Sequence, residues 1–202
     1  MFAFLAGLAA GLLHVFSGPD HLAAVAPLAT DRERGQWVTG LQWGIGHTLG
    51  VLLIATLLLL IKEQLPVDAI SVYSERIVGV SLIAIGGWGV RRAWVQRRSS
   101  ADAHAHSHSH AGASFTMGAI HGLAGSSHLF GVLPALAFPS RAASALYLAG
   151  FGVGAIAGMT AFSAAVGLLS TRMGRRHRSY GGLLYATSAA ALVVGGVWLV
   201  GH

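Results

Sequence analysis

Histidine and aspartate residues with the character of metal ligands lie inside apolar parts of the sequence. His14 precedes Asp20 and His21, and His47 lies in the next apolar run. An aspartate at the centre of a membrane helix costs about 2.5 to 3.5 kcal/mol, so such a residue indicates a function. Imidazole and carboxylate groups in a chain without cysteine favour nickel, cobalt, zinc or copper(II), and they suit magnesium or calcium poorly. The residue types do not choose among those four metals.

A helix break is needed if both early histidines are to bind one ion. In a continuous helix, His14 and His21 share a face but lie roughly 10.5 Å apart along the axis. One ion with bonds of about 2.1 Å does not span that distance. The tripeptide Ser17-Gly18-Pro19 lies between them, and a proline disfavours helical angles at the preceding residue. We therefore predict a broken helix in which both histidines converge with Asp20.

Each of these residues also has a structural interpretation. Ser17 with Asp20 three residues later matches a helix-capping pattern. We favour a ligand role for Asp20, and the same residue can also serve as a helix cap. A membrane histidine often makes only an interhelical hydrogen bond. We favour the ligand role for His14 and His21, which flank the predicted break, whereas for His47 the two interpretations are evenly balanced.

The composition is that of an integral membrane protein. Of the 202 residues, 54% are hydrophobic and 10% are charged, whereas soluble domains carry about 25% charged residues. A membrane-spanning helix needs about 20 mostly apolar residues. We expect an all-α protein with six spans, in the runs 1–30 (interrupted by Asp20), 38–61, 70–94, 114–140, 142–171 and 179–201. The third run is the weakest, because its uncharged part is only 77–90.

Basic residues predict the orientation. The loops after the first, third and fifth runs carry ten arginines, and the opposite side carries three basic residues. The positive-inside rule therefore places the arginine-rich side in the cytoplasm. We expect a multi-pass protein of the cell (inner) membrane with both termini outside the cytoplasm. Since the arginines lie between apolar runs, the net charge of +6 indicates topology and not nucleic-acid binding.

The two halves of the chain repeat each other. HVFSGPDHL, from His14, aligns with HGLAGSSHL, from His121, and both histidines recur 107 residues later. Glycines recur further on at offsets of 108 and 109. Each half contains three runs, an odd number, so the second half must cross the membrane in the opposite direction, as in many secondary transporters. We expect inverted three-helix repeats at 1–94 and 115–202, with the first helix of each broken.

The repeat adds candidate ligands from the second half. Asp20 becomes Ser127 there, and His47 becomes Ala155. We therefore expect an asymmetric site at the interface between the repeats, with most ligands from the first half. The predicted metal ligands are His14, Asp20, His21, His47, His121, Ser127 and His128.

A histidine-rich segment, residues 95–114, connects the two repeats. Its histidines occupy alternate positions, His104, His106, His108 and His110. This composition is typical of a flexible, metal-gathering tract, and the charge bias places it in the cytoplasm. The alternative is a solvated linker with no metal-binding role.

The motifs resemble a known transporter family. HVFSGPDHLAAVAPLA, GIGHTLG and IHGLAGSSHLFGVLPALA are similar to the short, six-helix UreH-like (urease/hydrogenase accessory) branch of the nickel/cobalt transporter superfamily, over nearly the whole chain. The superfamily signature is a histidine, four residues and Asp-His, whereas five residues separate His14 from Asp20 here. That departure places the chain in the shorter branch. The resemblance implies metal binding by His14, Asp20 and His21 and matches His47 to a second-helix histidine motif.

The function implied by the resemblance is a permease for Ni²⁺ or Co²⁺. The ion is then a substrate, no cofactor is expected, and uptake for an enzyme such as urease or hydrogenase is the favoured role. Besides the ion and the lipid bilayer, a cytoplasmic metallochaperone is a candidate partner. Metal efflux and a non-transporting metal sensor or accessory protein are the alternatives. We expect no enzymatic activity, because the chain has neither HExxH nor a nucleotide-binding glycine loop with lysine.

Overall fold

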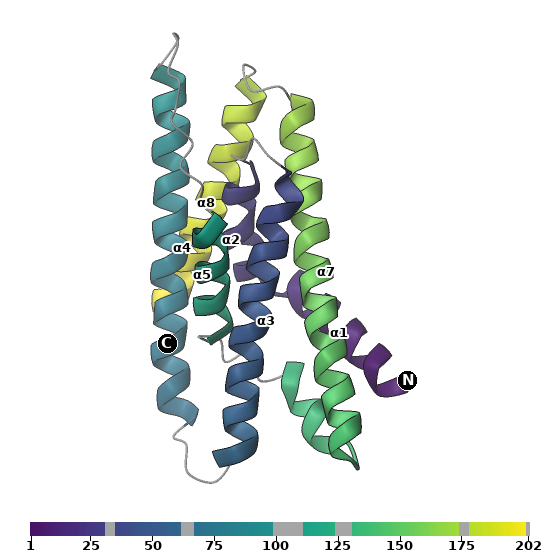
Figure 1. Cartoon of the computed structure of the whole chain (residues 1–202). Coiled ribbons are helices and arrows are strands. Elements are labelled where there is room, and N and C mark those ends of the chain that lie inside the picture. The colour runs from purple at the N-terminus through teal and green to yellow at the C-terminus, as the bar shows by residue number, and fades with distance from the viewer. Residues whose placement is uncertain (31–34, 62–66, 99–110, 124–130, 174–177, 201–202) are drawn as a thin grey trace.

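The fold is given by a computed structural model, which describes residues 1–30, 35–61, 67–98, 111–123, 131–173 and 178–200. Within these ranges the regular elements are all helical, which confirms the predicted all-α class (Figure 1). The α-helices are α1 (Phe2–Ser17), α2 (Pro19–Thr30), α3 (Gln36–Ile61), α4 (Val67–Arg98), α5 (Ala111–Leu123), α7 (Arg141–Met173) and α8 (Arg178–Val200). A short 3₁₀ helix, η1 (Leu133–Ala137), precedes α7.

Within the described residues, three helices are long and apolar enough to span a membrane. These candidate spans are Gln36–Leu57 in α3, Arg141–Arg172 in α7 and Tyr180–Val200 in α8. The bent pair α1–α2 makes a fourth if it counts as one span. Apolar residues such as Leu49 and Leu53 of α3 and Val193 and Val197 of α8 are exposed, as expected of surfaces that face lipid. The chain therefore has the character of a multi-pass membrane protein.

The first apolar run is broken at Gly18, as the Ser17-Gly18-Pro19 sequence predicts. The axes of α1 and α2 differ by 73°, and Gly18 is extended, with φ −89° and ψ 101°. The cause is Pro19, whose ring disfavours helical angles at the residue before it. In the second half, α5 ends at Leu123; the residues 124–130 are outside the described ranges, so the second predicted break stays a prediction.

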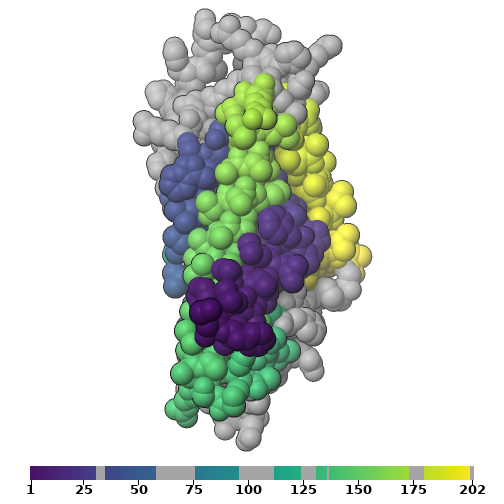
Figure 2. All heavy atoms as spheres, turned by 90° about the vertical axis from the view of Figure 1, so that its right-hand side faces the viewer, coloured from purple at the N-terminus to yellow at the C-terminus, as the bar shows by residue number. Residues whose placement is uncertain are grey.

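Helix α2 lies at the centre of the bundle. It packs against α3, α4, α7 and α8, and nine of its twelve residues are buried. The most extensive helix contacts are α1 with α7, α3 with α5, α4 with α8 and α3 with α7. Figure 2 shows α1 lying obliquely across α7, which runs along that face of the molecule. Gly18 itself is partly buried, between the exposed Ser17 and Pro19, and the chain enters the buried centre of the bundle at Asp20.

Glycines allow helices from the two halves to approach closely. A Cβ added to Gly11 in α1 would collide with the backbone oxygen of Phe151 in α7. A Cβ added to Gly118 in α5 would collide in the same way with the backbone oxygen of Trp43 in α3. Gly118 follows Gly11 by 107 residues and Phe151 follows Trp43 by 108. The two contacts therefore occupy corresponding positions in the two halves.

A second pair of glycine contacts follows the same rule. Gly154 of α7 packs against the backbone oxygen of Leu8 in α1, and Gly46 of α3 packs against that of Phe115 in α5. The corresponding residues are again 108 and 107 positions apart. The first helix of each half therefore packs against the long helix of the other half, through small residues that permit close contact.

Candidate metal centre

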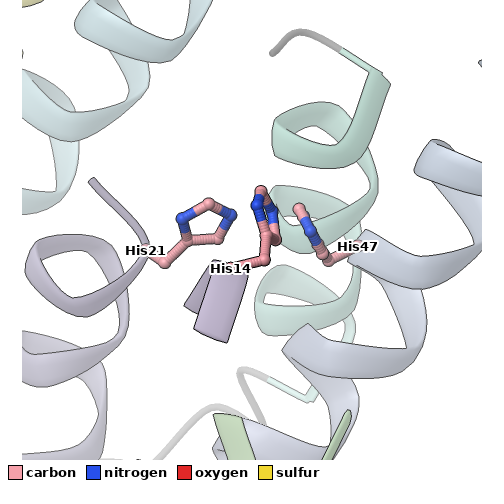
Figure 3. A group of neighbouring side chains, drawn as sticks. All are labelled: His14, His21 and His47. Carbon is pink, nitrogen blue, oxygen red and sulfur yellow. The ribbon is translucent and has the colours of Figure 1, made fainter. Parts of the chain in front are cut away.

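Four histidine rings gather where α1 ends and α2 begins. His14 comes from the last turn of α1, His21 from the first turn of α2, His47 from the middle of α3 and His121 from the end of α5. The His21 ring is central, because its centroid lies 4.7 Å from that of His14, 4.8 Å from that of His47 and 5.1 Å from that of His121. Figure 3 shows the rings of His14, His21 and His47 grouped together.

Asp20 joins imidazoles from the two halves of the chain. Its Oδ1 lies 3.1 Å from Nδ1 of His21, and its Oδ2 lies 3.0 Å from Nε2 of His121. The carboxylate is buried with both rings. A carboxylate that holds an imidazole on one side directs its other nitrogen toward a metal. Asp20 can therefore orient His21 as well as serve as a ligand.

The described residues contain two groups that could each hold a metal ion, and His21 belongs to both. One group is His14, His21 and His47; the other is Asp20, His21 and His121. Within each group, one ligand atom per residue lies within 4.8 Å of the others. Metal–nitrogen bonds of about 2.1 Å in a tetrahedral site need ligand atoms somewhat closer together, so an ion would draw either group inward.

The two groups differ in accessibility and in charge. His21, His47 and His121 are fully buried, whereas His14 is only partly buried. The first group consists of imidazoles alone, and it is the more accessible of the two because His14 is only partly buried. The second is enclosed and contains the carboxylate, which offsets the charge of a divalent cation in surroundings of low dielectric.

Gly18 permits this geometry in a way that the sequence pattern did not reveal. A Cβ at this position would collide with Nδ1 of His21 and lie 2.9 Å from Oδ1 of Asp20. The residue was predicted as part of the helix break alone. Its contact with the His21 ring depends on how α2 folds back over the end of α1, which residue types do not disclose.

The structure thus brings together all the predicted ligands that lie in the described residues. The remaining candidates are outside them: Ser127, His128 and the histidines of the connecting segment, His104, His106, His108 and His110. Those candidates stay predictions. The serine of the alternative capping pattern, Ser17, donates a hydrogen bond of 3.3 Å from its hydroxyl to the backbone oxygen of His14.

Comparisons with known proteins give relatives but no family model. The chain is similar to the Chloroplast protein FOR GROWTH AND FERTILITY 2 of Arabidopsis thaliana, at 36% identity over 94% of this chain and 54% of that protein. With FOR GROWTH AND FERTILITY 1 of the same organism, identity is 35% over 81% of this chain and 49% of that protein. The chain therefore spans about half the length of both chloroplast relatives.

The chain is also similar to UreH. This Urease accessory protein, of Bacillus sp. (strain TB-90), is 27% identical over 94% of this chain and 86% of its own length. That distant similarity supports the UreH-like relationship that the histidine motifs predicted. Neither a protein-family model nor a solved structure matches the chain.

Proposed function

We propose that the protein is a membrane permease for a divalent transition metal ion, with Ni²⁺ or Co²⁺ uptake as its function. The observation that carries this proposal is the pair of ligand groups that share His21 at a helix break. Together, the four imidazoles and one carboxylate of these groups are a suitable donor set for nickel, cobalt or zinc. Unwound backbone between two half-helices is a recurrent setting for ion sites in secondary transporters.

The sharing of His21 favours transport over permanent binding. An ion that moves from the group with His14 and His47 to the group with Asp20 and His121 keeps the His21 imidazole as a ligand throughout. No step then leaves the ion without a protein ligand in the membrane interior. A permanent site would gain nothing from a second, overlapping set of ligands.

The proposal includes six spans arranged as two inverted repeats. The reciprocal glycine contacts of α1 with α7 and of α5 with α3 support this arrangement, because they recur at the offsets at which the sequence repeats. In an inverted repeat, the substrate site lies at the interface of the halves near the membrane midplane. The contact between Asp20 of the first half and His121 of the second supports a site at that interface.

The same proposal places the protein in the cell membrane with both termini outside the cytoplasm. The arginine-rich loops then face the cytoplasm, as does the histidine-rich segment, which would pass metal to a cytoplasmic metallochaperone. UreH is named a urease accessory protein, which supports nickel as the ion and supply of a metalloenzyme as the role. The names of the chloroplast relatives refer to growth and fertility and give no substrate.

Radioactive nickel in whole cells tests the proposed function. Cells that express the protein are expected to accumulate more nickel than vector cells, and His21→Ala is expected to abolish the difference while remaining in the membrane. Depletion below the vector level would contradict uptake and turn the same site into an exporter. Equal content for both nickel and cobalt would contradict transport altogether and favour a sensor or accessory protein.

A further inference from the structure

Two aromatic side chains lie against opposite ends of the metal centre. The ring of Phe151 in α7 lies 5.4 Å from the ring of His14, and the ring of Trp43 in α3 lies 5.7 Å from the ring of His121. Both aromatic residues are almost completely buried, at 1% and 0% exposure. Each therefore fills the space beside one end histidine of the cluster.

The two contacts correspond to each other in the repeat. His121 follows His14 by 107 residues, and Phe151 follows Trp43 by 108. In each case the aromatic residue comes from one half and the histidine from the other. A contact that recurs at the repeat offsets belongs to the architecture of the site and not to the packing of one helix alone.

The helix directions place these aromatic residues on opposite sides of the site. In Figure 1, α3 begins at the upper end of the bundle and α7 begins at the lower end. Trp43 lies one helical turn before His47 in α3, and Phe151 lies one turn before Ala155 in α7. Each ring is therefore between the level of the metal centre and the end of the bundle at which its own helix begins.

A hydrogen bond holds the backbone of Gly131 over the ring of Phe151. A Cβ at Gly131 would lie 2.6 Å from Cε2 of Phe151, so the backbone of Gly131 lies directly on the ring. Tyr147, one turn before Phe151, donates a hydrogen bond of 2.8 Å from its hydroxyl to the backbone oxygen of Gly131. This bond fixes Gly131 in its position over the Phe151 ring.

Among the described residues, the Trp43 side has no such bond. Nε1 of Trp43 and Oγ1 of Thr39, one turn apart on α3, are buried and have no hydrogen-bond partner within the described ranges. A buried polar group without a partner is costly, and water that reached it would remove the cost. The two ends of the site thus differ, and the Trp43 end is the one that gains hydrogen bonds by opening.

We propose that Trp43 and Phe151 are the two gates of the metal centre, which close it toward opposite faces of the membrane, and that the Trp43 gate opens more readily. This inference rests on the proposed function, because alternate opening serves an ion that crosses. It adds two residues that do not bind the ion. They act by controlling from which face water and ions reach the histidines.

The chain has no cysteine, so a single introduced thiol reports which gate is open. Ala155 is fully buried in the core cluster that contains Trp43, and it lies one turn from Phe151. In an Ala155→Cys background, we expect Trp43→Ala to raise the rate of labelling by a membrane-impermeant thiol reagent at least about tenfold, only from the face at which α3 begins. Phe151→Ala should raise it from the opposite face, because labelling follows the population of the open form.

Matched variants on the same two helices provide the controls. Trp37 in α3 is half-exposed and Phe162 in α7 packs at the edge of the core, so Trp37→Ala and Phe162→Ala should leave labelling unchanged. Trp43→Phe should keep the site closed. If Trp43→Ala does not give a folded, monodisperse protein, Trp43→Leu is expected to give the same one-sided labelling to a smaller extent.

The labelling result stands independently of metal flux. Labelling from the same face in both gate variants, or from neither face in folded protein, would overturn the gate assignment even if nickel transport were intact. One-sided labelling in a protein that moves no nickel would uphold the gates and contradict the proposed function. The two failures are therefore distinguishable.

Discussion

His21 is the side chain through which both ligand groups are connected. Its ring lies within 5.1 Å of three other imidazole rings, centroid to centroid, and its Nδ1 is held by Asp20. Removing this ring takes a ligand from both groups at once, whereas removing His47 or His121 takes a ligand from one group only. The three histidines are therefore unequal, although all are buried.

We expect His21→Ala to weaken nickel binding far more than either single-group variant. For the purified protein, the predicted loss is at least about 100-fold for His21→Ala, and about 10-fold for His47→Ala or His121→Ala, since changes around a metal site commonly cost 10- to 100-fold in affinity. Isothermal titration of the protein in detergent measures these values. Equal losses in all three variants would contradict two overlapping groups and indicate one site that uses every ligand.

Gly18→Ala tests the close approach of the His21 ring. The added methyl group would displace Nδ1 of His21 and crowd Asp20. We therefore expect nickel uptake to fall at least about tenfold, because changes around a metal site commonly cost 10- to 100-fold in affinity. Gly87→Ala is the matched control, because nothing lies within 4 Å of a Cβ at that position. An unchanged uptake in Gly18→Ala would show that the ring does not need this geometry.

Residue patterns predicted the ligands near the break but not their neighbours. His14, Asp20 and His21 stand out because polar residues are costly in an apolar run that proline interrupts. The pairing of Asp20 with His121 spans 101 residues, and only the repeat linked these two segments of the chain. Trp43 and Phe151 gave no signal, because aromatic residues in apolar runs are ordinary core residues.

At the scale of helices, the metal centre depends on how α5 packs against α3. His121 lies in the last turn of α5, and Gly118, three residues earlier, lies against the backbone of Trp43. A larger residue at 118 would push α5 away from α3 and carry His121 with it. The position of one ligand is thus set by the absence of a side chain elsewhere on its helix.

We expect Gly118→Val to destabilise the protein by about 1 to 3 kcal/mol, as overpacking of a close contact does. Thermal unfolding in detergent measures the loss, and nickel affinity should fall with it. Gly196→Val is the control, because a Cβ there has no neighbour within 4 Å. A Gly118→Val protein as stable as the control would contradict the close α3–α5 contact.

Hydrophobic runs predicted most helices, but they did not predict every point at which a helix ends. Runs 38–61, 142–171 and 179–201 correspond closely to α3, α7 and α8. Run 114–140 contains α5, which ends at Leu123, and η1, which begins at Leu133, and the break predicted between them falls outside the described residues. In a uniformly apolar run, the residue types do not indicate where a helix ends unless a proline is present, as at Pro19. The tilt of α1 across α7 likewise follows from glycine contacts that no run displays.

At the scale of the whole molecule, the histidine-rich segment is separate from the metal centre in sequence and in proposed role. Deleting 103–110 should raise the nickel concentration needed for half-maximal uptake without ending uptake, because a gathering tract adds local ions and no ligand to the centre. Concentration-dependent uptake in cells measures this shift. Complete loss of flux on deletion would show that the segment is essential to the transport step.

Nickel flux into vesicles tests the central claim most directly. The purified protein is reconstituted into liposomes that contain a nickel-sensitive dye, and His21→Ala and Asp20→Asn are prepared alongside it. We predict dye quenching by external nickel with the unmodified protein, and quenching no faster than in protein-free liposomes with either variant. Equal rates for the unmodified protein and both variants would contradict transport through the histidine cluster.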